Sequence, residues 1–201
     1  LILTVHNSDV QLEGVIIVDD HQGSALEHIE YDFDTDGNFE QYDIATVADA
    51  DGSQIEDTLY AGTFGDDQIE AGAGNDVIFA DAGDDVVHGG KGIDLIFGSL
   101  GEDLLDGGEG DDIISGGLGF DIIKGGLGDD QIDGGTGADQ IVGGSGDDSI
   151  LGGEGDDSIL GGSGDDYIVG GVGSDAIDGG SGIDEIDYST DAVFAETAAK
   201  D

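Results

Sequence analysis

Gly143-Gly144-Ser145-Gly146-Asp147-Asp148-Ser149-Ile150-Leu151 is one copy of a nine-residue unit that fills the chain from residue 71 to residue 187. With its positions numbered 1 to 9, thirteen consecutive units follow without insertion or deletion. Position 4 is always Gly, position 6 is always Asp, and position 8 is always Ile, Val or Leu. An unbroken internal period of this kind decides the architecture before any other feature of the sequence.

The fixed positions predict a tight turn followed by a very short strand. Glycines at positions 1, 2 and 4 permit positive φ values that a side chain would penalise. In the following strand the position-8 residue faces one way and its neighbours face the other. A turn about every nine residues makes one coil from two units, so coils of 18 residues stack with parallel strands. We therefore expect an all-β fold, a parallel β-roll (β-solenoid) with two facing ladders of aliphatic residues as its core.

The position-6 aspartates are expected to stack along the two edges of this roll. Asp76, Asp94 and Asp112 fall on one edge, because they lie 18 residues apart, whereas Asp85 and Asp103 fall on the other. Stacked carboxylates repel one another unless a cation lies between them. Together with the exposed carbonyl groups of the glycine turns, they form a set of hard oxygen ligands suited to calcium.

The unit Gly-Gly-x-Gly-x-Asp-x-aliphatic-x resembles the nonapeptide of RTX (repeats-in-toxin) proteins, and the resemblance covers 117 of the 201 residues. It implies calcium ions between successive turns of each edge and export by a bacterial type I secretion machinery. Stacks of seven and six turns would hold up to eleven bridging Ca²⁺ ions. The carboxylate ligands expected from the motif are Asp67, Asp76, Asp85, Asp94, Asp103, Asp112, Asp121, Asp130, Asp139, Asp148, Asp157, Asp166, Asp175 and Asp184, and the expected carbonyl ligands belong to Gly89, Gly107, Gly125, Gly143, Gly161 and Gly179.

Composition and charge exclude some classes of partner and protein. The formal net charge of −46 excludes nucleic acid as a natural partner and opposes compaction unless cations neutralise it. A chain with 41 glycines and 49 acidic residues also fits a disordered acidic segment. We expect disorder without metal, but an aliphatic residue in every unit indicates a fold once calcium binds. Cysteine is absent, and no apolar stretch reaches the length of a membrane span. Lacking an initiator Met and a signal peptide, the chain is interpreted as a fragment or mature piece.

The repeat is flanked by less regular segments. Residues 1–51 are expected to form a small β-rich cap, and residues 188–201 a C-terminal tail. Between cap and repeat, residues 52–70 are interpreted as degenerate turns of a β-roll that spans 52–187. In Gly52–Tyr60, Asp57 and Leu59 are assigned to positions 6 and 8; in Ala61–Glu70, Asp67 and Ile69 follow after one inserted residue, Thr63 or Phe64. Asp81 and Ser99 replace the position-2 glycine, and calcium is least expected there.

Asp32-Phe33-Asp34-Thr35-Asp36-Gly37 matches the start of an EF-hand calcium loop. The twelfth position is Asp43 rather than the bidentate Glu that such a loop prefers. Alternation of Ile29, Tyr31 and Phe33 favours a strand entering a hairpin turn at Asp36-Gly37. A hairpin is preferred, and an additional calcium site at Asp32, Asp34 and Asp36 remains the alternative.

Positions 7 and 9 should face solvent, yet in the early units they are apolar. We expect an apolar patch on one sheet, because its members lie 18 residues apart in the sequence. Residues 1–51 are expected to cover it, with a partner protein or a second copy as the alternative, and tolerated surface apolarity as the neutral interpretation. The patch consists of Val77, Phe79, Leu95, Phe97 and Ile113.

No catalytic constellation or organic cofactor site is recognised: His6, His21, His28 and His88 form no His-Glu-x-x-His pair, and neighbouring carboxylates diverge. A repeated Thr/Asn array that would suggest ice binding is absent. The preferred function is a calcium-folded structural module of a secreted or cell-surface bacterial adhesin, surface-layer or matrix protein. The alternative is the C-terminal module of a secreted protease or lipase. Asp130 is expected to be a ligand, whereas Asp129 is expected to be only a solvated charge.

Overall fold

The computed structural model describes residues 40–43 and 58–188, and all regular structure in these residues is β. No helix there is long and apolar enough to cross a membrane. The strands are β1 (Glu40–Asp43), β2 (Thr58–Ala61), β3 (Gln68–Ala73), β4 (Val77–Phe79), β5 (Val86–Lys91), β6 (Leu95–Leu100), β7 (Leu104–Glu109), β8 (Ile113–Leu118), β9 (Ile122–Leu127), β10 (Gln131–Thr136), β11 (Gln140–Ser145), β12 (Ser149–Glu154), β13 (Ser158–Ser163), β14 (Tyr167–Val172), β15 (Ala176–Ser181) and β16 (Glu185–Asp187).

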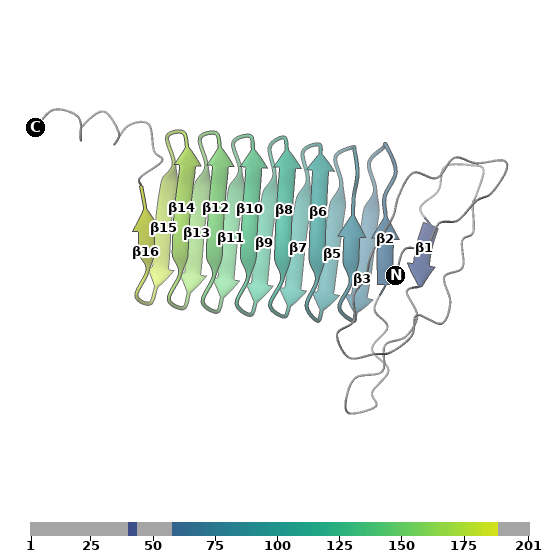
Figure 1. The fold of residues 1–201 in the computed structure, drawn as a ribbon, viewed down its shortest axis with the longest axis horizontal. Helices are drawn as coiled ribbons and strands as arrows, with labels where there is room; N and C mark the ends of the chain where they lie inside the picture. The colour runs from purple at the N-terminus through teal and green to yellow at the C-terminus, as the bar shows by residue number, and fades with distance from the viewer. Residues whose placement is uncertain (1–39, 44–57, 189–201) are drawn as a thin grey trace, which may run out of the picture.

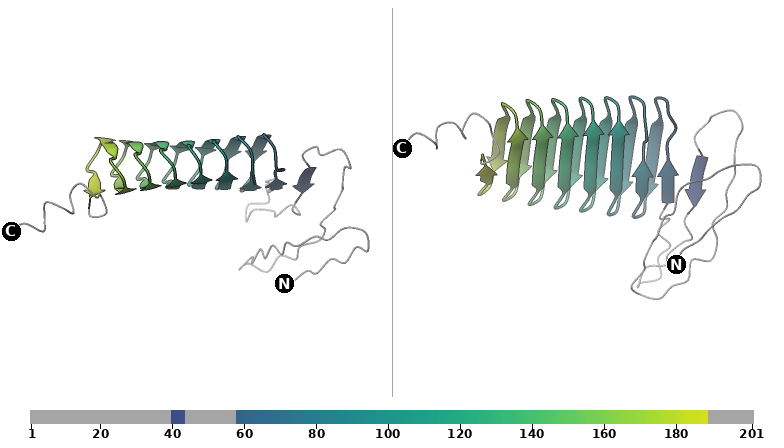
Figure 2. Two further views of the ribbon diagram at one scale, coloured as in Figure 1. Left: turned by 90° about the horizontal axis from the view of Figure 1, so that it is seen from above. Right: turned by 45° about the horizontal axis from the view of Figure 1, so that its top comes forward.

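The strands form two facing sheets because the chain changes sheet at every turn (Figures 1 and 2). One sheet has the order β1-β2-β4-β6-β8-β10-β12-β14-β16, and the other has the order β15-β13-β11-β9-β7-β5-β3. Each pairing from β2 onward is parallel and joins residues 18 apart, such as Ile132 and Ile150. Only β1 pairs antiparallel, with β2, among the described strands. The parallel β-roll with 18 residues per coil is confirmed.

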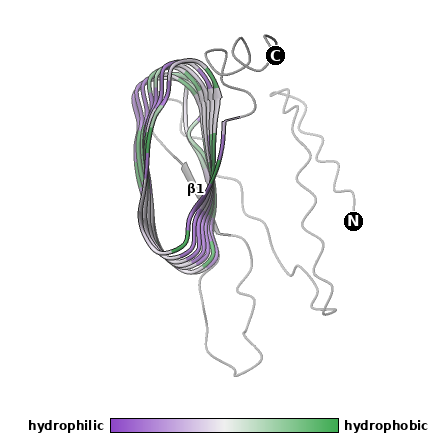
Figure 3. Cartoon of the chain, turned by 90° about the vertical axis from the view of Figure 1, so that its left-hand side faces the viewer, coloured by the Kyte–Doolittle hydropathy of each residue, from purple (hydrophilic) through white to green (hydrophobic). Residues whose placement is uncertain are grey.

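The core is the double ladder of position-8 side chains. From Ile69 to Ile168 each of these side chains is at most 3% exposed, while Ile177 and Ile186 near the last coil are only partly buried. Complete burial of one such side chain stabilises the fold by about 1.5–3 kcal/mol. Seen along the stack, the coils superpose as a flattened oval with hydrophilic bands at the turns (Figure 3). The aliphatic residue in every unit is therefore what closes the two sheets on each other.

The turns depend on left-handed backbone at positions 2 and 4. In the type unit these are Gly144 and Gly146, with φ of 125° and 129°. Asp81 and Ser99 adopt the same conformation at position 2, with φ of 80° and 79°. A non-glycine residue in this region costs about 1–2 kcal/mol. The stack imposes its turn geometry on both residues despite that cost.

Two assignments at the start of the roll are wrong. Tyr60, not Leu59, pairs with Ile78 and is buried in the core. Tyr60, Ile69 and Ile78 are thus spaced by nine, so no residue is inserted between residues 61 and 70. The regular nine-residue spacing is hard to recognise here because the aromatic Tyr60 occupies position 8, which is aliphatic in the other units. Several predictions fall outside the described residues. They concern Asp57, the candidate ligands Asp32, Asp34 and Asp36, the tail after residue 188, and all of the expected cap except β1.

The expected apolar patch is contiguous. Val77, Leu95 and Ile113 are in register across β4, β6 and β8, and the rings of Phe79 and Phe97 stack with centroids 5.0 Å apart. A second apolar row, which the sequence analysis missed, crosses the opposite sheet at Val86, Leu104 and Ile122. Both outer faces of the first coils are therefore apolar.

Candidate metal centre

Position-6 aspartates form a continuous ladder along each edge of the roll. The backbone N–H of one aspartate donates to Oδ1 of the aspartate one coil later, over 2.8–3.1 Å. The first such bond joins Asp67 to Asp85, and the last joins Asp166 to Asp184. The predicted stacking of these side chains on two edges is confirmed.

The second carboxylate oxygen of the ladder residues is buried. It has no hydrogen-bond partner among the described residues in Asp85, Asp103, Asp112, Asp121, Asp130, Asp139, Asp148, Asp157, Asp166 and Asp175. A buried acceptor without a partner carries a large desolvation cost, and a buried anion costs more. A proton or a cation at Oδ2 would remove that cost.

Burial also changes the acidity of the ladder. Desolvation raises the pKa of Asp112 and Asp148 to about 7, and that of Asp130 to about 6. The backbone N–H bond to Oδ1 opposes this effect, while neighbouring carboxylates add to it. The pKa values of Asp85, Asp121 and Asp157 are likewise raised to about 6, mainly by burial. Without calcium, the carboxylates of the folded ladder therefore bind protons at pH values close to neutral.

From residue 89 onward, a glycine at position 1 lies against the Oδ2 atom of its own unit. At Gly98 the point where a Cβ atom would stand is 2.5 Å from Asp103 Oδ2 and 2.6 Å from the carbonyl oxygen of Gly116 in the next coil. We call this arrangement a cradle: a position-1 glycine, Oδ2 of the same unit and the position-1 carbonyl oxygen of the next coil. Within the regular units, complete cradles occur at Gly89, Gly98, Gly107, Gly116, Gly125, Gly134, Gly143, Gly152 and Gly161. Asp67 Oδ2 and the Ala80 carbonyl also meet at Gly62, before the regular units, but this Oδ2 already accepts bonds from the Thr63 N–H and hydroxyl over 2.6 and 3.0 Å.

The cradles bring carbonyl groups close to the aspartates on both edges, and five of the six expected glycine carbonyls, all except that of Gly89, are among them. The carbonyls of Gly107, Gly125, Gly143, Gly161 and Gly179 do face the aspartates of one edge. Sequence reasoning named carbonyls on that edge alone. The other edge has the same arrangement, with the carbonyls of Gly116, Gly134, Gly152 and Gly170. The signal for them was the position-1 glycine of the alternate units.

This donor set suits calcium. It combines carboxylate and carbonyl oxygens, which are the ligands that Ca²⁺ takes in proteins, six to eight at a time. Among residues 59–188, no group of three or more His, Cys, Asp or Glu side chains is placed to hold a metal ion. Backbone carbonyls must therefore contribute to the coordination, and the cradles supply them.

A second ladder, at position 5, corrects the prediction for Asp129. Its Oδ1 accepts a bond of 2.8 Å from the Asp147 N–H, and its own N–H donates to Asp111 Oδ1. The ladder continues to Asp165 and runs in the opposite sense to the inner one. Asp129 is thus not merely a solvated charge, although its side chain is exposed. In an Asp-Asp pair such as Asp129-Asp130, the first aspartate belongs to the outer ladder and the second to the inner ladder.

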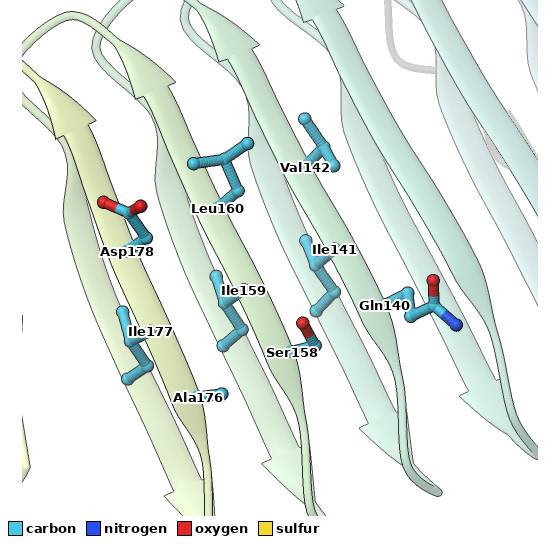
Figure 4. Close-up of a pocket in the computed structure, with 9 residues that line it drawn as sticks. All are labelled: Gln140, Ile141, Val142, Ser158, Ile159, Leu160, Ala176, Ile177 and Asp178. Atoms are coloured by element: carbon cyan, nitrogen blue, oxygen red, sulfur yellow. The ribbon is translucent and has the colours of Figure 1, made fainter.

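Away from the two edges, the described surface has a hollow and exposed ion pairs. A shallow hollow over β11, β13 and β15 is lined by three rows of side chains (Figure 4). Among its nine lining residues only Asp178 is ionisable. Elsewhere Lys124 pairs with Asp106 at 3.0 Å and Lys91 with Glu109 at 2.5 Å. These exposed cross-coil pairs stabilise the fold by about 0–1 kcal/mol each.

Comparison with known proteins agrees with this geometry. The family model of the RTX calcium-binding nonapeptide repeat matches four times, over residues 61–96, 88–123, 115–150 and 151–186. A search of curated proteins finds no match. RTX repeats bind calcium, and the roll they form is a structural domain rather than a catalytic one. The matches together span more than half of the sequence, so this chain belongs to the RTX calcium-binding nonapeptide repeat family.

Proposed function

We propose that the chain is a calcium-dependent folding module whose inner carboxylate ladders hold the ions between coils. The ligands would be Oδ2 of the position-6 aspartates and the position-1 carbonyls of the next coil. One observation carries the proposal: at each complete cradle, a buried Oδ2 and a carbonyl oxygen face the same small space. Two oxygens so placed favour binding of a hard cation, because the buried carboxylate oxygen otherwise keeps its desolvation cost.

Electrostatics explain why folding would await calcium. A formal charge of −46 disfavours a compact chain, and each bound Ca²⁺ offsets two negative charges. Extracellular calcium sites have dissociation constants of about 10⁻⁴–10⁻³ M, well above the calcium concentration of a resting cytosol. The chain would therefore leave the cell unfolded and fold outside. RTX repeat proteins are typically secreted bacterial proteins, which supports export by type I machinery.

In this proposal the folded roll serves as a structural part of an adhesin, surface-layer or matrix protein. The apolar outer rows and the absence of an acid–base pair in the described hollow support a structural role. The alternative is a calcium-dependent module of a secreted protease or lipase. Coding sequence upstream of Leu1 discriminates between them: a zinc-protease or serine-hydrolase motif favours the enzyme, and tandem β-sandwich repeats favour the adhesin.

Ion selectivity tests the proposed ligands. Calcium at about 0.1–1 mM should compact the chain in sedimentation velocity, because its flexible coordination accepts carbonyl and carboxylate oxygens. Magnesium at the same concentration should not, because it keeps its water ligands and demands octahedral geometry. Equal compaction by the two ions would indicate charge screening in place of built sites.

A further inference from the structure

Position 1 of the repeat is glycine in every regular unit except the first two. These carry Ala71 and Ala80. Ala80 is completely buried, the position-1 glycines of later units are buried too, and Ala71 packs against the core. The two exceptions lie on opposite edges, in the first regular unit of each edge.

A methyl group is incompatible with the cradle seen elsewhere. At Gly98, Asp103 Oδ2 and the Gly116 carbonyl oxygen lie within 2.6 Å of the point that a Cβ would occupy. Real Cβ atoms essentially never come within 3.0 Å of an atom outside their own and the adjacent residues. Ala80 has a Cβ at the equivalent point. Asp85 Oδ2 and the Gly98 carbonyl oxygen must therefore each lie farther from the Cβ position than Asp103 Oδ2 and the Gly116 carbonyl oxygen do. A carbon atom occupies the space toward which the two oxygens converge in later coils.

The first coils have other sources of stability. The hydroxyl group of Tyr60 donates to the carbonyl oxygen of Ala71 over 2.8 Å, so this position-1 carbonyl is satisfied by a side chain. Tyr60 is buried in the core, and the rings of Phe79 in β4 and Phe97 in β6 stack on each other. Later coils have Gln131 and Ser149 in the same surface row as Val77, Leu95 and Ile113. The hydrogen bond of Tyr60 to Ala71 and the Phe79–Phe97 stack thus both involve the first coils, in which alanine replaces glycine.

We propose that Ala71 and Ala80 block calcium binding at Asp76 and Asp85, so that the ion ladders begin at the cradles of Gly89 and Gly98. Of the eleven bridging positions expected from the regular units, the nine complete cradles bind calcium. The first coils are held by apolar packing and by the Tyr60 hydrogen bond. This inference rests on the proposed calcium ladders and specifies where they start.

Counting bound calcium on the full chain tests the inference. Equilibrium dialysis of the double variant Ala71→Gly/Ala80→Gly should show two more Ca²⁺ ions per chain than the wild type. The matched control is Ala73→Gly/Ala82→Gly, which removes two methyl groups from position 3 of the same units. Its calcium count should equal that of the wild type. The reverse variant, Gly98→Ala, should bind one ion fewer.

Thermal unfolding in saturating calcium gives an independent readout. Glycine in place of alanine ordinarily lowers stability, through backbone entropy. Two additional ions bound only by the folded roll reverse that sign, so the double variant should melt higher than its control. If wild type and double variant bind the same number of ions, the inference is overturned while the proposed function stands. Absence of calcium binding by the wild type would overturn both.

Discussion

Replacement of Asp130 by Asn tests the carboxylate ladder at its centre. In the folded chain, Oδ1 of Asp130 accepts the Asp112 N–H over 2.8 Å, and Oδ2 lies in the cradle of Gly125 with the Gly143 carbonyl. Asn keeps an oxygen for the backbone bond but replaces the charged ligand by an amide. Asp129→Asn, one residue away, removes the same charge from an exposed side chain and also keeps its oxygen.

The expected magnitude follows from one lost ion. At about 10 mM calcium and a dissociation constant of about 10⁻⁴–10⁻³ M, one site stabilises the folded state by about 1.4–2.7 kcal/mol. Asp130→Asn should lower the free energy of unfolding by about that amount. An exposed substitution that touches no buried group usually changes it by about 0.5 kcal/mol or less, which is the expectation for Asp129→Asn.

Urea unfolding followed by circular dichroism measures the difference. With a slope of about 1–3 kcal/mol per molar urea, the Asp130→Asn midpoint should fall by roughly 1 M, and that of the control should hardly move. Equal shifts for the two variants would refute the reasoning, because net charge rather than a placed ligand would then govern stability.

The remaining predictions concern pH, the apolar patch and the N-terminal acidic loop. In the calcium-free roll, burial raises the pKa values of Asp112 and Asp148 to about 7 from the usual value of about 4. The folded roll therefore binds protons at these carboxyls more tightly than the unfolded chain does. This stabilises the folded state below about pH 4, and the effect is lost as the pH rises to about 7. The calcium midpoint of folding should accordingly rise as the pH falls from 8 to about 6, since protons compete for Oδ2; a constant midpoint would contradict this. Phe79→Asp/Phe97→Asp should speed proteolysis of residues 1–51 if they cover the patch, whereas unchanged cleavage in a monomer would show that they do not. If Asp32–Gly37 is a hairpin, Asp32→Asn/Asp34→Asn/Asp36→Asn should leave the number of bound calcium ions unchanged; one ion fewer would establish the EF-hand-like alternative.

Much of the roll could be predicted because each feature repeats with the same physical cause. The aliphatic residue at position 8 predicts the core, and the glycine at position 4 predicts the turn. Asp at position 6 predicts an edge ladder as soon as two units make a coil. Thirteen repetitions of these three residues leave one register in which all aliphatic side chains are buried together.

The structure differs from the sequence prediction where an unusual residue type occupies a repeat position, or where a residue contributes a hydrogen bond or a backbone carbonyl group. Tyr60 takes an aliphatic position, so its phase was misread, and Asp129 uses an ordinary exposed carboxylate for a hydrogen bond that the sequence does not reveal. The carbonyl groups that we propose as ligands on the second edge belong to the main chain, which every residue has. Only the structure shows which of those atoms face a carboxylate.

The most direct measurement is the far-ultraviolet circular dichroism of the full chain in chelator and again after calcium is restored. The account predicts a disordered spectrum in chelator, because buried carboxylates and a charge of −46 then oppose folding, and a β spectrum once calcium returns. A β spectrum that persists in chelator at neutral pH would contradict the claim that calcium binding drives this chain to fold.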